Sequence, residues 1–166
     1  MPITPFHFGP GALLHAVAPR QVSFLAYCAA NVLIDLESLY NLVNHRHPVH
    51  AFLHNYVGAT LVIPATVLFF LLARRLAAGG RLFGTLDWTG LSLVPVGLGA
   101  AAGAWSHVLL DSVMHHDIRP LSPFSVDNAL QGALDLDLLH VLCAVAGLAG
   151  AAIVAAGGTR FRGRIR

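Results

Sequence analysis

The sequence contains no lysine, so every permanently cationic side chain is an arginine. Charged residues make up only 11% of its 166 residues, whereas hydrophobic residues make up 56%. A soluble domain typically spends about a quarter of its residues on Asp, Glu, Lys and Arg. So few charges cannot keep the surface of a folded domain in water, which excludes a soluble protein and indicates a surface covered by lipid. The net charge of +2 gives no basis for nucleic-acid binding.

Cysteine and cleavable-signal features are also scarce. The two cysteines, Cys28 and Cys143, fall in apolar stretches near opposite membrane faces, so a disulfide is not expected. The N-terminus lacks the basic segment and short apolar core of a cleaved signal peptide. We therefore expect the first membrane span to remain in the mature protein.

Four apolar stretches are long enough to cross a bilayer, which takes about 20 helical residues. They cover residues 22–44, 56–72, 91–110 and 138–156. The sequence therefore predicts an all-α fold, a polytopic membrane helix bundle of about four transmembrane helices in which residues 1–166 form a single domain. Residues 6–18 are too short to span and predict a short N-terminal helix, either lying at the interface or dipping into the bundle as a half-helix.

The arginines are distributed unevenly between the two faces of this predicted bundle. Eight lie on one face: Arg20, Arg74, Arg75, Arg81, Arg160, Arg162, Arg164 and Arg166. Only Arg46 and Arg119 lie on the other. Because basic residues concentrate in cytoplasmic segments, we expect an integral membrane protein with a cytoplasmic C-terminus.

The ten histidines are an anomaly in so apolar a chain. Eight fall on the outer face: His45, His47, His50, His54, His107, His115, His116 and His140. Asp35, Glu37 and Asp111 approach the same face from inside predicted spans. Asp35 lies about 13 Å of helix below the outer end of its span, where a carboxylate costs several kcal/mol unless it is paired. Two explanations remain open for Asp35: an ion pair with Arg46 or Arg119, or a bound cation.

Two pairs on the outer side have metal-ligand spacing. His107 and Asp111 are four residues apart, as are His50 and His54, and this spacing places two side chains on one helical face. Together with Asp35, these pairs indicate a metal site. We expect His47, His115 and His116 to be solvated, and Glu37 either to reach the interface or to join the site. His140 is either oriented by Asp137, three residues before it, or lies at a helix start capped by Asp135 and Asp137.

Several segments resemble a known family. SHVLLDS at 106–112, followed by RPLSPF at 119–124, resembles the SHxxxD…PF signature of membrane-bound metal-dependent hydrolases, inner-membrane proteins related to zinc-dependent phospholipase C and P1 nuclease. IDLE at 34–37 resembles their Asp-x-Asp element, with Glu in the second acidic place. HRHPVHAFLHN at 45–55 resembles their HRxxTHS element, with departures at Val49 and Ala51. It fits in two registers, so His45 and His54 compete for one position.

The resemblance covers residues 5–125 and implies a helical site in a bacterial inner membrane that binds two or three divalent metal ions, expected to be zinc, through His and Asp. The metal ligands carried over or indicated by spacing are His7, Asp35, His50, His54, His107 and Asp111. The expected catalytic residues are Asp35, His107, Asp111 and Arg119, with metal-activated water attacking a phosphoester or related bond in a lipid-like substrate. The lipid bilayer and this small molecule are the expected partners, and nucleic acid is not.

Three other functions stay open at this point. A di-iron membrane oxidase needs several histidine boxes, and the boxes with paired histidines are missing because His115-His116 has no histidine two or three residues upstream. A non-catalytic haem carrier would not need Asp35 or Asp111. A metal transporter would need polar groups through the whole membrane, whereas the inner halves of the last three predicted spans are apolar. A structural membrane protein with incidental histidines would leave those carboxylates unexplained.

Overall fold

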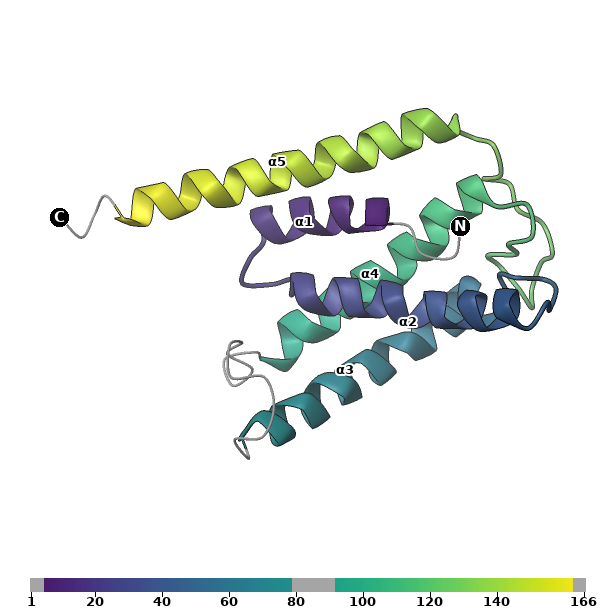
Figure 1. The fold of residues 1–166 in the computed structure, drawn as a ribbon, viewed down its shortest axis with the longest axis horizontal. Helices are drawn as coiled ribbons and strands as arrows, with labels where there is room; N and C mark the ends of the chain where they lie inside the picture. The colour runs from purple at the N-terminus through teal and green to yellow at the C-terminus, as the bar shows by residue number, and fades with distance from the viewer. Residues whose placement is uncertain (1–4, 79–91, 163–166) are drawn as a thin grey trace.

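The computed structural model describes residues 5–78 and 92–162, which are helices and connecting loops without a strand (Figure 1). Two of the helices, η1 and η2, are single 3-10 turns. The elements are η1 Pro5–His7, α1 Phe8–Val17, α2 Phe24–Val43, η2 Phe52–His54, α3 Tyr56–Ala78, α4 Leu93–Met114 and α5 Leu136–Arg162. The predicted all-α bundle with a short N-terminal helix is confirmed.

Among the described residues, three helices are long and apolar enough to cross a membrane. They contain the segments Tyr56–Leu76, Leu93–Met114 and Leu136–Gly157. The first predicted span, 22–44, forms α2, which is 20 residues long but is not one of the three. Its inward face carries buried polar side chains, among them Asn31, Asp35 and Asn41, which lower its hydropathy. The polar side chains on its buried face thus make α2 less apolar than the other long helices.

The short helix α1 lies inside the bundle, packed between α5 and α2 rather than across the end (Figure 1). Glycines let α1 and α5 approach closely, as is common between membrane helices. A Cβ on Gly9 would overlap the carbonyl oxygen of Cys143, and a Cβ on Gly150 would lie 2.6 Å from the carbonyl carbon of Ala12. Of the two arrangements left open by the sequence, the structure has the half-helix.

The contact between α2 and α4 is equally close and builds the core. A Cβ on Gly103 would overlap the backbone of Tyr27, and Asn31 donates from Nδ2 to the carbonyl of Gly103 over 3.3 Å. Small and branched side chains fill the space around this crossing: Ala30, Ile34, Ala59, Val62, Ala100, Ala104 and Val108. This packing fixes the faces of α2 and α4 that point at each other.

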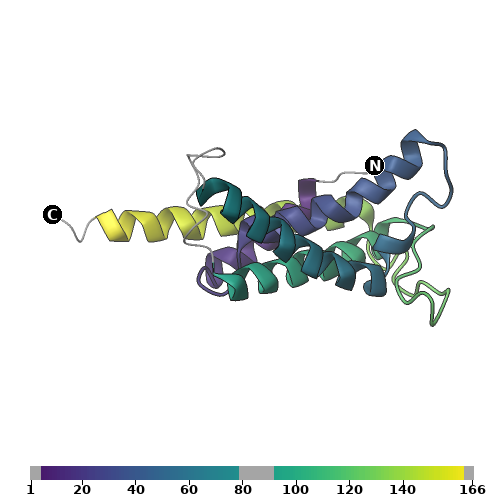
Figure 2. The ribbon, with the colours of Figure 1, turned by 90° about the horizontal axis from the view of Figure 1, so that it is seen from below.

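The two ends of the bundle differ in composition. Loops 44–55 and 115–135 lie together at the end opposite the C-terminus (Figures 1 and 2). Arg46 and Arg119 are exposed at this end, whereas Arg20, Arg74 and Arg75 are exposed at the other. Arg81, Arg164 and Arg166 lie outside the described residues, as do the side chains of Arg160 and Arg162. The described arginines therefore keep the predicted asymmetry.

Candidate metal centre

Three elements bring four ligand-type side chains together near the loop end. Asp35 comes from α2, His54 from η2, and His107 and Asp111 from α4, and all four are buried. Each offers one nitrogen or oxygen atom, and these atoms lie within 4.8 Å of one another. We call these four residues the central cluster.

The two imidazoles of the central cluster face the two carboxylates. His107 Nε2 is 3.4 Å from Asp35 Oδ1 and 3.2 Å from Asp111 Oδ2. His54 Nε2 is 3.9 Å from Asp35 Oδ1 and 3.6 Å from Asp111 Oδ2. The sequence predicted that these four residues would converge, and the structure brings them together.

Asn31 determines which nitrogen of His107 faces the carboxylates as an acceptor. The Asn31 amide donates from Nδ2 to the carbonyl of Tyr27 over 2.9 Å, so its Oδ1 points at His107 Nδ1, 2.9 Å away. Nδ1 must then be the donor, and in the neutral ring Nε2 carries a lone pair. Metal-ligating histidines are held in this way, by a hydrogen bond from the other ring nitrogen. Sequence reasoning did not single out Asn31, although it lies one helical turn before Asp35.

His7 adds a third imidazole from η1. Its Nε2 lies 3.2 Å from Asp111 Oδ1, and its ring meets that of His107 edge-on with centroids 4.7 Å apart. Four buried atoms here have no hydrogen-bond partner: His7 Nδ1, His7 Nε2, His107 Nε2 and Asp111 Oδ1. Buried polar atoms are costly without a partner. A proton on His107 Nε2 would give a partner to that atom alone. A cation among these groups would also give one to the unpartnered atoms of His7 and Asp111.

Glu37 supports the central cluster without belonging to it. Its Oε1 accepts from the backbone N–H of Phe52 over 3.1 Å, and its Oε2 accepts from that of Leu53 over 2.7 Å. These bonds hold the start of η2, the turn that carries His54. The Ser38 hydroxyl, one residue further along α2, lies 3.3 Å from His54 Nε2. Glu37 and Ser38 thus both position His54.

The competition between His45 and His54 is resolved by their positions. His54 is 0% exposed and belongs to the central cluster, whereas His45 is exposed on the loop that follows α2. Two registers were possible from the sequence because His45 precedes His50 by five residues and His54 follows it by four. The two histidines are distinguished only by the fold, because the loop comes back to α2 through its bonds to Glu37 and brings His54 with it.

The arginines are not the partners of Asp35. The Arg46 guanidinium lies over the Tyr40 ring, 5.2 Å from its centroid, and Arg119 is exposed. The ring atoms that face Asp35 are instead the Nε2 atoms of His54 and His107, at 3.9 and 3.4 Å. The arginine pair is therefore not formed, and the cation site is the explanation for this deeply placed carboxylate that stays open. Arg119 lines a pocket of about 230 Å³ together with His50 and Asp117.

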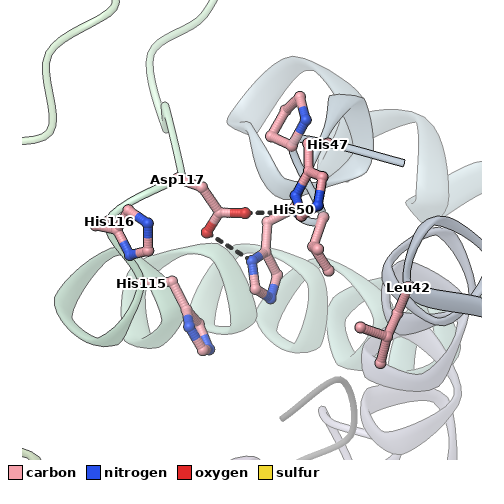
Figure 3. A pocket seen from close by; sticks show the side chains of 8 residues that line it. Leu42, His47, His50, His115, His116 and Asp117 are labelled. Carbon is pink, nitrogen blue, oxygen red and sulfur yellow. Dashed lines mark hydrogen bonds and ion pairs between the residues drawn. The ribbon is translucent and has the colours of Figure 1, made fainter. Parts of the chain in front are cut away.

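A larger pocket of about 720 Å³ opens beside the cluster at the loop end (Figure 3). We call it the outer pocket; its lining includes His50, His115 and Asp117. His50 donates to Asp117 twice, from its backbone N–H to Oδ2 over 3.1 Å and from Nδ1 to Oδ1 over 2.8 Å. Burial would raise the pKa of Asp117, but these two bonds hold it below its ordinary value. Asp117 is therefore fixed against His50 rather than free in its loop.

His115 departs most from expectation. We expected a solvated loop side chain, but its ring stacks on that of His50 with centroids 4.2 Å apart. Burial lowers the pKa of His115 to about 4 and also lowers that of His50, so both rings are neutral at pH 7. A signal was present, because His115 follows Asp111 by the same four residues that separate Asp111 from His107. That spacing was not a guide to a shared face, because α4 ends at Met114, one residue before His115.

Comparison of the chain with protein-family models, with curated proteins and with solved structures finds no match in any of the three. The resemblance to membrane-bound metal-dependent hydrolases therefore rests on the short segments described above. The buried His and Asp cluster stands independently of it.

Proposed function

We propose that this protein is a metal-dependent hydrolase of the membrane, in which the central cluster and His7 hold a divalent cation. The observation that carries the proposal is His107 Nε2, a buried acceptor without a hydrogen-bond partner that faces Asp35 and Asp111. Two imidazoles and two carboxylates form a nitrogen and oxygen donor set of the kind that zinc accepts. Zinc is therefore the metal proposed.

The chemistry proposed is attack of water on a phosphoester or related bond. A cation bound here would lower the pKa of a coordinated water and supply hydroxide near neutral pH. Asp35 and Asp111 supply the negative charge that retains a cation, and Asn31 keeps His107 Nε2 available as a ligand. Arg119, beside His50 and Asp117, is placed to receive a phosphate, because a guanidinium matches phosphate oxygens in a bidentate way.

The substrate proposed is lipid-like, because the cluster lies near one end of the bundle. We place this end on the outer side of a bacterial inner membrane, with the C-terminus in the cytoplasm, because most arginines lie at the other end. A head group can then reach the outer pocket while its tails stay in lipid.

The orientation makes a direct prediction. A reporter fused after Arg166 should be active only if it is of a kind that works in the cytoplasm. A reporter enzyme that requires export should be inactive at the same position. Activity of the exported reporter alone would reverse the orientation and place the cluster at the cytoplasmic side.

The hydrolytic activity is tested with the purified, zinc-supplemented protein and vesicles of phosphatidylcholine and phosphatidylglycerol. We expect release of a phosphorylated head group that stops on chelation and returns with zinc. Arg119→Ala should raise KM by about 10-fold or more with a smaller change in kcat, since a charged hydrogen bond contributes about 1.5–3 kcal/mol. Arg46→Ala is the matched control, because Arg46 lies over Tyr40. A protein that binds zinc but releases no head group would favour the non-catalytic metal-binding alternative.

A further inference from the structure

A polar pocket of about 480 Å³ lies at the arginine-rich end of the bundle, opposite the central cluster. The connection between α1 and α2 and the start of α4 lie together at this end, on the side of the C-terminus (Figures 1 and 2). The residues that line the pocket include His15, Arg20, Ser23, Phe24 and Ser92. We call it the Arg20 pocket, and the central cluster and the outer pocket use none of these side chains.

The Arg20 pocket is suited to an anion. Arg20 is exposed, and its guanidinium offers five N–H donors. His15 donates from Nδ1 to the carbonyl of Val22 over 2.7 Å, and in the doubly protonated ring Nε2 is a further donor. Ser92 makes no side-chain cap bond at the start of α4, so its hydroxyl can donate to a ligand.

The distribution of charge also favours an anion here. The acidic side chains that the structure describes belong to the central cluster or to the segments around it at the loop end. Arg20, Arg74 and Arg75 are exposed at the opposite end. Within the described residues, a negatively charged ligand in the Arg20 pocket therefore meets arginines and no carboxylate.

An apolar groove of about 480 Å³ adjoins this pocket, between α1, α2 and α5. Phe24 lines both the pocket and the groove. Phe8, Ala12 and His15 follow one another at four and three residues, a spacing that places them on one face of α1. Phe8 and Ala12 line the groove, whereas His15 lines the pocket, and its ring lies beside that of Phe24 with centroids 6.3 Å apart. We call this groove the α1 groove.

A phospholipid matches this combination of a polar pocket and an apolar groove. Its phosphate lies at the membrane surface and its acyl chains lie in the bilayer core, in the same order as the pocket and the groove along the bundle. The α5 wall of the groove offers an acyl chain only weakly polar or apolar residues: Cys143, Ala144, Gly147 and Leu148. Basic pockets between membrane helices bind anionic head groups in this way. A phosphate ion alone would use the pocket and leave the groove without an occupant.

Loose contact with exchanging bilayer lipids is the simplest alternative. It gives no reason for a cationic pocket to adjoin an apolar groove along one face of α1. We propose that the Arg20 pocket and the α1 groove together bind one anionic phospholipid, with its phosphate at Arg20 and one acyl chain between α1 and α5. The site lies at the other end of the bundle from the central cluster, so the proposal does not depend on the proposed function.

A lipid bound here would hold α1 in the bundle. This helix has only 10 residues, and it begins directly after His7, whose Nε2 lies 3.2 Å from Asp111. An acyl chain along Phe8 and Ala12 adds contacts to the close packing of α1 on α5. Because a ligand that binds only the folded state stabilises it, phosphatidylglycerol should raise the thermal unfolding midpoint.

The test is binding of phosphatidylglycerol to the full chain, delipidated in detergent, treated with a chelator and measured by native mass spectrometry. Arg20→Ala should weaken this binding about 10-fold or more, because a hydrogen bond to a charged group contributes about 1.5–3 kcal/mol. Arg75→Ala is the matched control, because Arg75 is exposed at the same end but is not among the residues that line the pocket. Equal weakening in the two variants would mean attraction to diffuse surface charge and would overturn the site.

The groove is tested separately with two variants in α5. Ala144 and Val145 are both exposed, but only Ala144 lines the groove. Ala144→Phe should weaken lipid binding about fourfold for each methylene that the ring displaces, whereas Val145→Phe should leave it unchanged. Size-exclusion chromatography and helical circular dichroism confirm that each variant is folded. Equal binding by these two variants would overturn the placement of an acyl chain in the groove.

The identity of the ligand is tested with two other probes. Phosphatidylcholine should bind at least about fivefold more weakly than phosphatidylglycerol, because its choline cation opposes the arginines. Inorganic phosphate at the same concentration should not displace phosphatidylglycerol. Equal affinity for the two lipids would refute recognition of an anionic lipid, and displacement by phosphate would identify a phosphate-ion site instead.

Discussion

Asp111→Asn is expected to remove bound metal almost completely while the protein still inserts in the membrane. Asp111 faces His7, His54 and His107 within 3.6 Å, and no other residue in the central cluster meets so many imidazoles. Changes to residues behind the ligands typically cost about 10–100-fold in metal affinity. Loss of a ligand itself should cost more than that. The measurement is elemental analysis of the purified variant.

Asp127→Asn is the control for this change. It removes the same charge with nearly the same shape, but Asp127 is exposed and bonded only to Ser125 in its own loop. It should keep the metal content of the unchanged protein. Asp117→Asn is not a neutral control, because Asp117 holds His50. Equal metal in the Asp111 and Asp127 variants would mean that the cluster is a packing and hydrogen-bonding network.

Gly103→Ala is expected to cause a large loss of stability. A Cβ at position 103 would overlap the carbonyl oxygen of Tyr27 and lie 3.0 Å from its Cα. Backbone atoms cannot yield as a flexible side chain can, so α2 and α4 must separate. Overpacking of this kind typically costs about 1–3 kcal/mol. The thermal unfolding midpoint in detergent should fall.

Gly97→Ala provides the matched control in the same helix. A Cβ at position 97 would have nothing within 4 Å, and replacing a helical glycine by alanine stabilises by about 0.5–1 kcal/mol. Its midpoint should stay level or rise. Gly103→Ala should also lower metal affinity, because Asn31 bonds to the Gly103 carbonyl and orients His107. Identical midpoints for the two variants would show that the crossing of α2 and α4 is not as close as described.

The fold was largely predictable because a bilayer leaves few solutions. Long apolar runs become helices, since only helices satisfy their own backbone within lipid when strands are lacking. Two features required the structure. The apolarity of 22–44 could not show that the resulting α2 is the polar-faced helix of the bundle, and the composition of 6–18 could not show that α1 packs against α5.

The site was predictable where ligands share a helix and not where they depend on a loop. His107 and Asp111 follow from a spacing of four residues, and Asp35 follows from the cost of a carboxylate at its depth. The choice of His54 over His45 depends on Glu37 bonding to the backbone of η2, which no local pattern encodes. His115 lies just beyond the last residue of α4, where helical spacing is no longer a reliable guide.

Asn31 and Asp117 show a different limit of the sequence. Each orients a histidine from a distant part of the chain, at a sequence separation of 76 for Asn31 and His107 and 67 for His50 and Asp117. Such partners have no characteristic spacing, because they are set by how α2 meets α4 and how loop 44–55 meets the end of α4. They become visible only when the tautomer of each ring is worked out.

Elemental analysis of the unchanged protein shows whether the buried cluster holds a divalent cation. The protein is purified in mild detergent from cells grown with zinc, iron and manganese, then freed of loosely bound ions. We expect tightly bound zinc that only a chelator removes. Iron in its place would favour the oxidase alternative. A folded protein that carries no metal and takes up none when zinc is added would refute the cation site. A proton on His107 would then be the positive charge facing Asp35 and Asp111.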